Sequence, residues 1–235
     1  MASFSWSYSV MGMFENCPRK YWAVKIAKID DSNKFNIKGD EEHQGIERYL
    51  KSGLLLPPRM QPLTRVLDLV KHAPGEMYIE YKMALKRDLT VTHGRDWDGC
   101  WVRINADLIK VNNDAATYLD WKSGKARDSE DQINLTALGI FRLFPAVQKV
   151  KGGLVHYTEN KLSSPTIVHR SDESRLWNGF ITRASDIERA VQTNDFPTNP
   201  NPLCGWCPYR ACPFNRQDER EKVEATGAKW KWRPL

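Results

Sequence analysis

Two aspartates and a lysine lie near the ends of two consecutive predicted strands. Asp107 belongs to the first strand, and the triplet Asp120-Trp121-Lys122 ends the second, thirteen residues further on. Neighbouring strands can bring both carboxylates together, and carboxylate oxygens are the ligands that hard cations such as Mg²⁺ and Mn²⁺ prefer. Lys122 projects from the same strand face as Asp120, so its ammonium can hold an attacking water or a developing phosphate charge. The pattern indicates metal-dependent cleavage of a phosphate ester, with the Trp121 carbonyl as a further metal ligand.

Four of the five cysteines have a spacing suited to a metal. Cys204, Cys207 and Cys212 lie close together in a segment rich in proline and aromatic residues, and Cys17 lies far back in the chain. Such a segment offers little apolar core for free thiols, and a Cys-x-x-Cys pair in an intracellular chain favours metal binding or redox work over structural disulfides. Four thiolates can hold a [4Fe–4S] cluster, and they can equally hold a tetrahedral zinc ion. Cys100 is interpreted as a small apolar residue.

The elements that position these residues follow from the periodicity of apolar side chains. Alternation predicts three strands of an antiparallel meander and a later fourth strand, at Met77–Leu85, Trp101–Val111, Ala116–Trp121 and Gly153–Tyr157. Helical spacing predicts helices at Ser7–Lys25, Gly39–Leu50, Thr64–Lys71, Asp128–Phe144 and Asp172–Thr193. The stretch between the first two helices, Lys28–Asn36, is expected to be irregular. Asp107 and Asp120 then fall on neighbouring strands.

The composition bounds the class of protein. The chain has 235 residues, of which 41% are hydrophobic and 27% charged, which suits one domain with its own core and argues against general disorder. A formal net charge of +6 and a pI near 9.0 favour a polyanionic partner, but they support only non-specific attraction. The sequence has no recognisable signal peptide and no run approaching about 18 apolar residues, so no contact with a membrane is expected.

Taken together, the charged motifs resemble those of the PD-(D/E)xK nuclease superfamily, and within it the RecB-like nucleases and the CRISPR-adaptation exonucleases. The matching pieces stand in the family's order and approximate spacing, namely His43, Asp107, Asp120-Trp121-Lys122 and Gln132. The resemblance implies a restriction-endonuclease-like α/β core, with a mixed central sheet flanked by helices. It also implies that His43 and both aspartates bind the metal, that Lys122 serves the attacking water, and that Gln132 supports the site. The Asp-x-Lys pattern alone would favour a solvated strand end, and this context reverses that interpretation.

Two positions depart from the family's pattern. Ala106 precedes Asp107 where a glycine is common, and Thr136 follows Gln132 by four residues where a tyrosine is common. Neither departure removes a metal ligand. The remaining acidic candidates are more simply surface or loop residues than ligands, namely Glu80 on a strand and Asp96 and Asp98 in a loop.

The cysteines resemble those of RecB-like nucleases that carry an iron–sulfur cluster, with one cysteine near the N-terminus and three near the C-terminus. This resemblance favours a [4Fe–4S] cluster over zinc, held by Cys17, Cys204, Cys207 and Cys212. The cluster would join residues 1–28 and 195–216 into one subregion of a single nuclease domain, 1–235, whose catalytic core is 39–160. Its expected role is structural, because metal binding contributes directly to folding.

The expected function is a Mg²⁺- or Mn²⁺-dependent deoxyribonuclease, most simply an exonuclease that acts on DNA ends or single strands in recombination, repair or processing. No base-reading helix is left once the core is assigned, which favours an exonuclease over a sequence-specific endonuclease. The resemblance is compatible with a bacteriophage enzyme and with a recombination or CRISPR-adaptation protein as partner. The expected location is the cytoplasm of a bacterium or a phage-infected cell.

Basic and aromatic residues supply candidate contacts to DNA. Cations near the motifs can engage phosphates, and they are Arg19, Lys20, Lys122, Lys125, Arg127, Arg210 and Arg216. Trp230 and Trp232 can stack on bases, or they can belong to a tail that packs on the protein. Two other functions stay open, namely a non-cleaving protein of the same fold that binds DNA ends or recruits a partner, and an iron–sulfur or zinc module that binds nucleic acid.

Overall fold

The computed structural model describes residues 4–32, 34–92, 99–123, 129–159 and 161–233. The chain divides into two compact units. The sheet unit comprises Met1–Tyr8 and Lys34–Thr182, and the cysteine unit comprises Ser9–Asn33 and Arg183–Leu235. Each unit is described by itself. Within the described residues, no helix combines the length and the apolar character needed to cross a membrane.

The sheet unit is built on one mixed sheet of six strands. The strands are β1 Glu76–Leu85, β2 Val102–Asn112, β3 Ala115–Lys122, β4 Lys149–His156, β5 Lys161–Leu162 and β6 Thr166–His169. Strands β1, β2 and β3 form the predicted antiparallel meander, and β4 lies parallel to β3 after the crossover helix α5, Glu130–Leu143. Strands β5 and β6 both pair antiparallel with β4. The predicted α/β fold with a mixed central sheet is confirmed.

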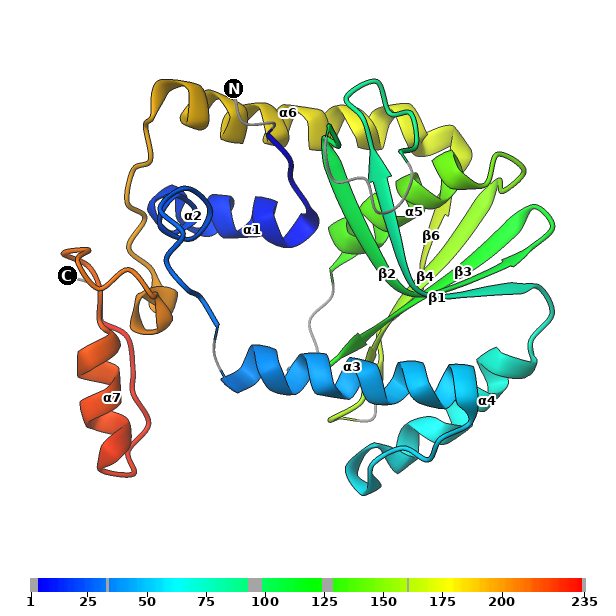
Figure 1. Cartoon of the computed structure of the whole chain (residues 1–235), viewed down its shortest axis with the longest axis horizontal. Helices are drawn as coiled ribbons and strands as arrows, with labels where there is room; N and C mark the ends of the chain where they lie inside the picture. Colours follow the sequence, from blue (N-terminus) through cyan, green and yellow to red (C-terminus); the bar gives the residue numbers. More distant parts are fainter. Residues whose placement is uncertain (1–3, 33, 93–98, 124–128, 160, 234–235) are drawn as a thin grey trace. The chain divides into compact units, whose positions relative to one another are not determined.

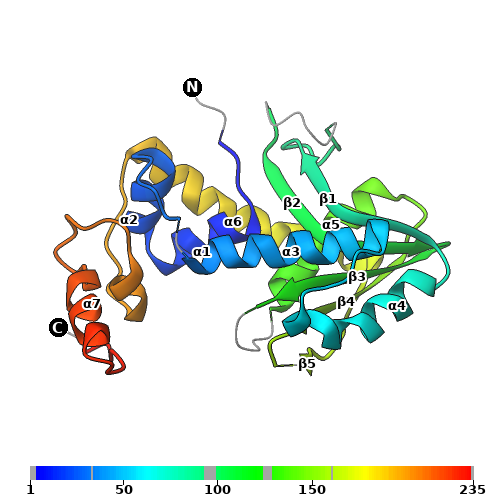
Figure 2. The same cartoon turned by 60° about the horizontal axis from the view of Figure 1, so that its bottom comes forward.

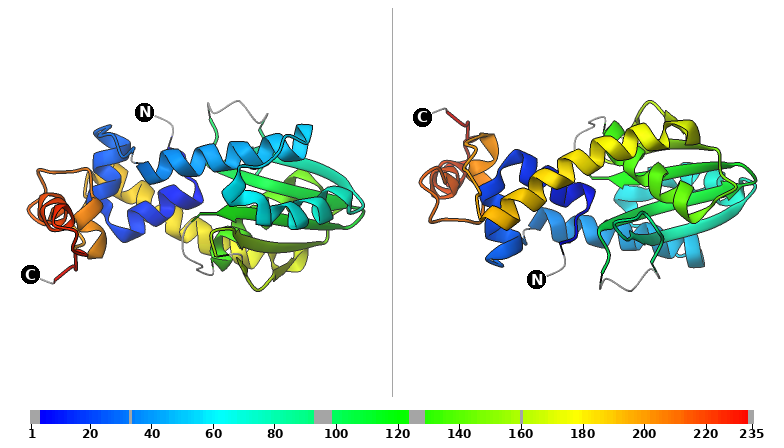
Figure 3. Two further views of the ribbon diagram at one scale, coloured as in Figure 1. Left: turned by 90° about the horizontal axis from the view of Figure 1, so that it is seen from below. Right: turned by 90° about the horizontal axis from the view of Figure 1, so that it is seen from above.

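Helices cover both faces of this sheet (Figures 1 and 3). One face carries α3, Lys34–Ser52, the 3₁₀ segment Pro58–Leu63 and α4, Thr64–His72, and the other face carries α5. The α3–α4 face encloses a buried apolar cluster that includes Ile46, Leu50, Leu67, Leu108, Trp121 and Val155. On the other face, Gly152 lets α5 lie close to β4, because a Cβ there would come within 2.2 Å of the Ile133 side chain. Both helices that carry expected site residues are therefore fixed by core packing.

The sheet forks in its middle, and the fork is where the two aspartates lie. Strand β2 pairs with β1 over almost its whole length but with β3 only from Leu108 to Asn112. The last pair before the fork joins Leu108 to Leu119, and the next residues on the two strands are Asp107 and Asp120. Figure 2 shows β1 and β2 bending away from β3 beyond this point. The two aspartates therefore lie on adjacent strands at the point where the backbone ladder between β2 and β3 ends.

Most of the predicted elements agree with the structure, but several differ in extent and some were not predicted. The expected irregular stretch Lys28–Asn36 is wrong at its end, because α3 begins at Lys34. The fourth strand begins earlier than predicted, at Lys149. The short edge strands β5 and β6 and the helix α7, Gln217–Ala225, were not predicted. Short edge strands and a helix without a buried side chain carry little periodicity, because periodicity records burial on one face.

The cysteine unit consists of short helical segments and turns. It contains α1, Tyr8–Asn16, α2, Pro18–Tyr21, the π-helical turn Trp22–Ile26, the end of α6, Glu173–Thr193, the 3₁₀ turn Pro202–Trp206 and α7. The first predicted helix is interrupted at Cys17, whose backbone is extended at φ −164° and ψ 108°. Proline disfavours helical backbone in the residue before it, and Pro18 follows Cys17. The break therefore takes the Cys17 backbone out of the helix.

Candidate functional site

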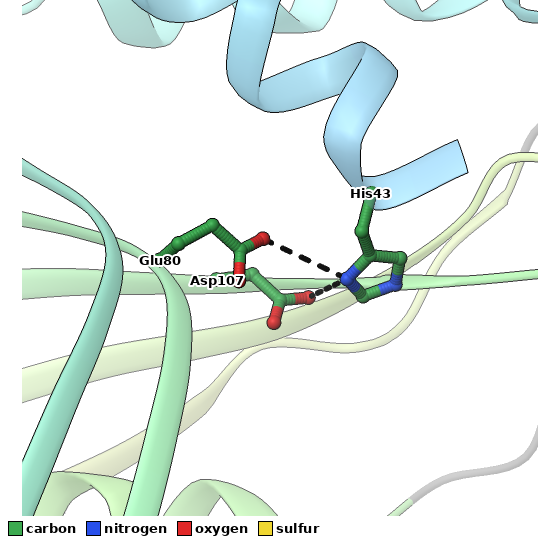
Figure 4. Close-up of side chains that lie close together, drawn as sticks. All are labelled: His43, Glu80 and Asp107. Atoms are coloured by element: carbon green, nitrogen blue, oxygen red, sulfur yellow. Dashed lines mark ion pairs between the residues drawn. The ribbon is translucent and has the colours of Figure 1, made fainter. Parts of the chain in front are cut away.

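Three side chains of the sheet unit converge at the fork (Figure 4). They are His43 from α3, Glu80 from β1 and Asp107 from β2. The His43 Nδ1 atom lies 3.7 Å from Glu80 Oε1 and 3.5 Å from Asp107 Oδ2. Among the described residues, this is the one group of three or more His, Cys, Asp or Glu side chains whose ligand atoms all lie within 4.8 Å of one another. A ring nitrogen and two carboxylates form a donor set that fits a divalent cation.

The backbone of Glu80 departs from regular strand geometry. Its φ is +50°, in the left-handed region, and the β1–β2 ladder is interrupted between the pairs Ile79–Leu108 and Tyr81–Ala106. That interruption sets Glu80 opposite Asp107. Backbone strain of this kind persists where the surrounding structure enforces it, and it concentrates at functional sites.

The irregularity at Glu80 also changes which face of the sheet the strand presents. Before it, Ile79 packs with the α3–α4 cluster, whereas after it Met83 lies against Gly139 of α5. A regular strand would place residues 79 and 83 on one face, because side chains alternate. The change of face accompanies the turn of the Glu80 carboxylate toward His43.

The interpretation of Glu80 as an ordinary surface glutamate is therefore wrong. Its side chain is 31% exposed, but the carboxylate faces His43 and Asp107. The sequence around it, Tyr78-Ile79-Glu80-Tyr81, gives no signal of the irregular backbone. The position becomes identifiable once the register of β1 against β2 is known.

A second group lies on the neighbouring strand around Asp120, whose side chain is almost completely buried. Asp120 Oδ2 lies 2.6 Å from the Lys122 Nζ atom. Asp120 Oδ1 accepts hydrogen bonds from the Tyr118 hydroxyl at 2.9 Å and from the Gln132 side chain at 2.7 Å. Gln132 therefore approaches Asp120 from the first turn of α5, as the resemblance implied, and Tyr118 is a contact that the sequence did not suggest.

The backbone of Trp121 joins the two groups. Its N–H donates to Asp107 Oδ2 at 2.8 Å, and its carbonyl lies 3.0 Å from His43 Nε2. The Trp121 indole is buried in the apolar cluster beneath α3 and α4, which fixes this backbone in place. If the ring carries its proton on Nε2, that nitrogen donates to the carbonyl, and Nδ1 is left with a lone pair directed at the two carboxylates. The Trp121 carbonyl, expected as a metal ligand, contacts His43 in this structure.

The buried carboxylate of Glu42, next to His43, anchors α3 to the sheet. Glu42 is 1% exposed, accepts a hydrogen bond from the Tyr157 hydroxyl and lies 3.0 Å from the Arg59 guanidinium. Tyr157 follows the end of β4, so the contact ties the helix to the carboxyl end of that strand. Because Glu42 precedes His43 in the sequence, these contacts also fix the position of His43.

The carboxylates determine the charge state of the group. Burial alone would lower the pKa of His43, but the hydrogen bond with Glu80 and the charge of Asp107 outweigh it and raise the pKa to about 9. Burial and the charge of Asp120 raise the pKa of Asp107 to about 7, against the opposing effects of His43 and the Trp121 N–H. Without a cation, the imidazole is therefore protonated at neutral pH and partly neutralises the carboxylates. A divalent cation can take over that role.

The four expected cluster ligands line one cavity of the cysteine unit, formed by Cys17, Cys204, Cys207 and Cys212 together with Arg19, Lys20 and Tyr209. All four thiols are free. Burial raises the pKa of Cys207, and the nearby Cys17 and Cys212 add to the rise. The nearness of three thiols from distant parts of the sequence is compatible with either of the expected centres, a [4Fe–4S] cluster or a zinc ion.

The remaining expected residues have varied surroundings. Cys100 is 1% exposed, which agrees with its interpretation as a small apolar residue, and its sulfur accepts a hydrogen bond from the Arg103 Nε–H. Arg210 and Arg216 form ion pairs with acids of α7. Trp230 packs against Gly205 and lies edge-on to Trp206, so one of the two tail tryptophans belongs to the packing of the cysteine unit. The loop acids and two of the expected phosphate contacts lie outside the described residues, namely Asp96, Asp98, Lys125 and Arg127.

Comparison with known proteins gives one family. A model described as the PD-(D/E)XK nuclease superfamily matches residues 79–213, more than half of the chain. Among solved structures, the crystal structure of SSO0001 is similar with a TM-score of 0.48 and 14% sequence identity, covering 92% of this chain and 89% of that chain. No curated protein matches the chain.

Proposed function

The chain belongs to the PD-(D/E)XK nuclease superfamily, and on that premise we propose that it is a Mn²⁺- or Mg²⁺-dependent deoxyribonuclease acting on DNA ends or single strands. The observation that carries the proposal is the convergence of His43, Glu80 and Asp107 within 4.8 Å at the fork of the sheet. Membership of this family implies metal-dependent nuclease activity. The choice of DNA ends rests on the absence from the sequence of a recognisable base-reading helix.

The donor set supports Mn²⁺ in particular. His43 offers a nitrogen, and Glu80 and Asp107 each offer a carboxylate oxygen. Mg²⁺ prefers oxygen ligands, whereas sites of mixed nitrogen and oxygen also bind divalent transition metals such as Mn²⁺. When bound, a divalent ion lowers the pKa of water and polarises a phosphate oxygen. We therefore expect Mn²⁺ to support cleavage at lower concentrations than Mg²⁺.

Lys122 supplies a positive charge in addition to that of the bound metal ion. Its ammonium lies 2.6 Å from Asp120 Oδ2, and its side chain is 35% exposed, so it can reach a phosphate or a water at the open side of the fork. The carboxylate of Asp120 orients the ammonium, and Gln132 holds the opposite carboxylate oxygen. A cation fixed in this way stabilises negative charge that develops on the phosphate as the water attacks.

We also propose that the cysteine unit binds a [4Fe–4S] cluster. The four thiols line one cavity although Cys17 and Cys204 are far apart in the sequence. The choice of the cluster over a zinc ion follows the resemblance of these cysteines to those of RecB-like nucleases that carry an iron–sulfur cluster. Arg19 and Lys20 line the same cavity and would offset the negative charge of four thiolates. The cluster would be structural, since the unit consists of short segments with little apolar core.

The biological setting completes the proposal. We place the enzyme in DNA recombination, repair or processing, in the cytoplasm of a bacterium or a phage-infected cell, with a recombination or CRISPR-adaptation protein as partner. This assignment follows the resemblance of the motifs to RecB-like nucleases.

The proposal is tested by incubating the purified protein with single- and double-stranded DNA, labelled at the 5′ or the 3′ end, in Mn²⁺ or Mg²⁺. We expect products whose label shows progressive removal of nucleotides from one end, and no products after chelation of the metal. The alternative is a non-cleaving protein that binds DNA ends. Intact DNA in every condition, together with stable binding to its ends, would support that alternative.

A further inference from the structure

Asp120 depends on protein donors, because its side chain is only 3% exposed. A buried carboxylate that has lost its water requires hydrogen-bond donors or cations from the protein. The Lys122 ammonium lies next to Asp120 Oδ2. The other oxygen, Oδ1, accepts hydrogen bonds from Tyr118 and Gln132. The rotation of the carboxylate is therefore set by the two groups on Oδ1.

Tyr118 is placed by the strand itself. It lies two residues before Asp120 on β3, so both side chains project from the same face of the sheet, toward α5. The ring is completely buried and its hydroxyl lies 2.9 Å from Asp120 Oδ1. The same hydroxyl is 3.5 Å from the Gln132 nitrogen, so the phenol, the amide and the carboxylate form one compact group.

Thr136 leaves the space for this arrangement. It lies one helical turn after Gln132, and its hydroxyl donates to the Gln132 carbonyl at 2.9 Å. It is buried and interacts with the Tyr118 phenol. The small side chain of Thr136 therefore lies beside the large ring that enters from the strand.

From these contacts we propose that Tyr118 is a positioning residue of the nuclease site, which fixes the Asp120 carboxylate so that Oδ2 faces Lys122. The charge of Asp120 acts on both His43 and Asp107, so the carboxylate that Tyr118 holds lies close to the candidate metal ligands. The inference rests on the proposed metal-dependent activity. Groups that hydrogen-bond to a ligating carboxylate orient it, and their loss typically lowers metal affinity or activity about 10–100-fold. The competing interpretation is that the Tyr118 hydroxyl only makes the hydrogen bond that a buried tyrosine needs, with no role in the site.

The test compares two tyrosine-to-phenylalanine variants of the full chain. Tyr118→Phe removes the donor to Asp120 and keeps the ring. Tyr49→Phe is the matched control, because Tyr49 is also buried in the sheet unit and donates to an aspartate, Asp68, at 2.6 Å. Mn²⁺ binding is measured from the electron paramagnetic resonance signal of free Mn²⁺, and DNA cleavage and thermal unfolding are measured on the same samples.

We expect Tyr118→Phe to weaken Mn²⁺ binding about 10–100-fold, with a melting temperature close to that of Tyr49→Phe, and we expect Tyr49→Phe to bind Mn²⁺ like the wild type. Cleavage by Tyr118→Phe should recover in part at high Mn²⁺. Unchanged Mn²⁺ affinity in Tyr118→Phe, or an equal loss in both variants, overturns the inference.

Two further measurements distinguish failure of the inference from misfolding of the variant and from failure of the proposed function. If Tyr118→Phe does not fold, Thr136→Val tests the same group, and a smaller loss of Mn²⁺ affinity is expected because the partner of the phenol is removed. Wild-type affinity in that variant contradicts the inference. If the wild type itself neither binds Mn²⁺ nor cleaves DNA, the proposed function fails, whereas an active wild type with an unaffected Tyr118→Phe contradicts only the role of Tyr118.

Discussion

In the sheet unit the candidate metal ligands project from long strands and a helix of 19 residues, whereas in the cysteine unit the thiols lie on short turns. His43, Glu80 and Asp107 are brought together by strand register and by core packing that exist without a cation. Cys17 and Cys204 line one cavity, but the segments that carry them bury few side chains. The candidate site of the sheet unit is therefore organised by the fold, whereas the proposed cluster would itself help to organise the cysteine unit.

The largest effect is expected from loss of a cysteine ligand. Cys207→Ser should remove the brown colour and the soluble yield together, because metal-linked folding free energies reach about 10 kcal/mol in small metal-binding units. Cys100→Ala is the control, since Cys100 is the fifth cysteine and is not among the residues lining the cavity. Visible absorbance and yield are measured for both. A Cys207→Ser protein that keeps its iron absorbance would remove Cys207 from the ligand set.

Loss of the Lys122 ammonium should have a smaller effect, which should be confined to the rate of DNA cleavage. Lys122→Met is expected to slow DNA cleavage at saturating Mn²⁺ by about 10²–10³-fold, which is typical when a group that stabilises developing charge is removed. Lys151→Met, at an exposed position of β4, should cleave at the wild-type rate. Cluster absorbance should be the same in all three proteins. Equal rates for the two variants would contradict the role of Lys122.

Metal affinity in the sheet unit should depend on pH in a defined direction. His43, with a pKa near 9, holds a proton at neutral pH, and a metal must displace that proton to use the nitrogen. Mn²⁺ affinity should therefore fall about tenfold per pH unit from pH 9 to pH 7, and more steeply below about pH 7, where Asp107 also takes up a proton. Calorimetric titration at several pH values measures this slope. An affinity that does not change between pH 7 and pH 9 would contradict the assignment of His43 as a ligand.

The smallest effect concerns the backbone at Glu80. Glu80→Gly and Glu80→Ala both remove the carboxylate and should both weaken Mn²⁺ binding. They differ in backbone strain, because a left-handed conformation costs about 1 kcal/mol for residues with a Cβ and much less for glycine. Glu80→Gly should therefore have the higher free energy of unfolding, by about 1 kcal/mol. Elsewhere in a strand glycine is the less stable of the two, so an alanine variant that is more stable here would show that the strain is absent.

The candidate site could be predicted from the sequence where its charged residues lie on strands that alternate regularly between apolar and polar side chains. The strands that carry Asp107 and Asp120 alternate clearly, and the spacing of Asp120 and Lys122 alone places both on one face of a strand. The α5 helix follows from helical spacing, whereas the mixed sheet was expected from the resemblance to the nuclease superfamily. Gln132 was expected from its place in the motif, and it does hydrogen-bond to Asp120.

The contacts that the sequence did not reveal depend on register and on local backbone. Glu80 joins His43 and Asp107 because β1 pairs with β2 in one particular register and because its backbone is left-handed, and neither property leaves a pattern in the residues. Tyr118 resembles any other buried tyrosine of a strand until the position of α5 shows its hydroxyl beside Gln132. These are tertiary properties, so they were visible only in the structure.

One diffraction experiment tests the central comparison most directly. Crystals grown with Mn²⁺ are measured at the manganese and the iron absorption edges, and anomalous difference maps are calculated for each metal. We predict a manganese peak bounded by His43, Glu80 and Asp107, and an iron peak bounded by Cys17, Cys204, Cys207 and Cys212. A manganese peak elsewhere, or none at saturating Mn²⁺, would contradict the proposed catalytic site, and zinc in place of iron would contradict the proposed cluster.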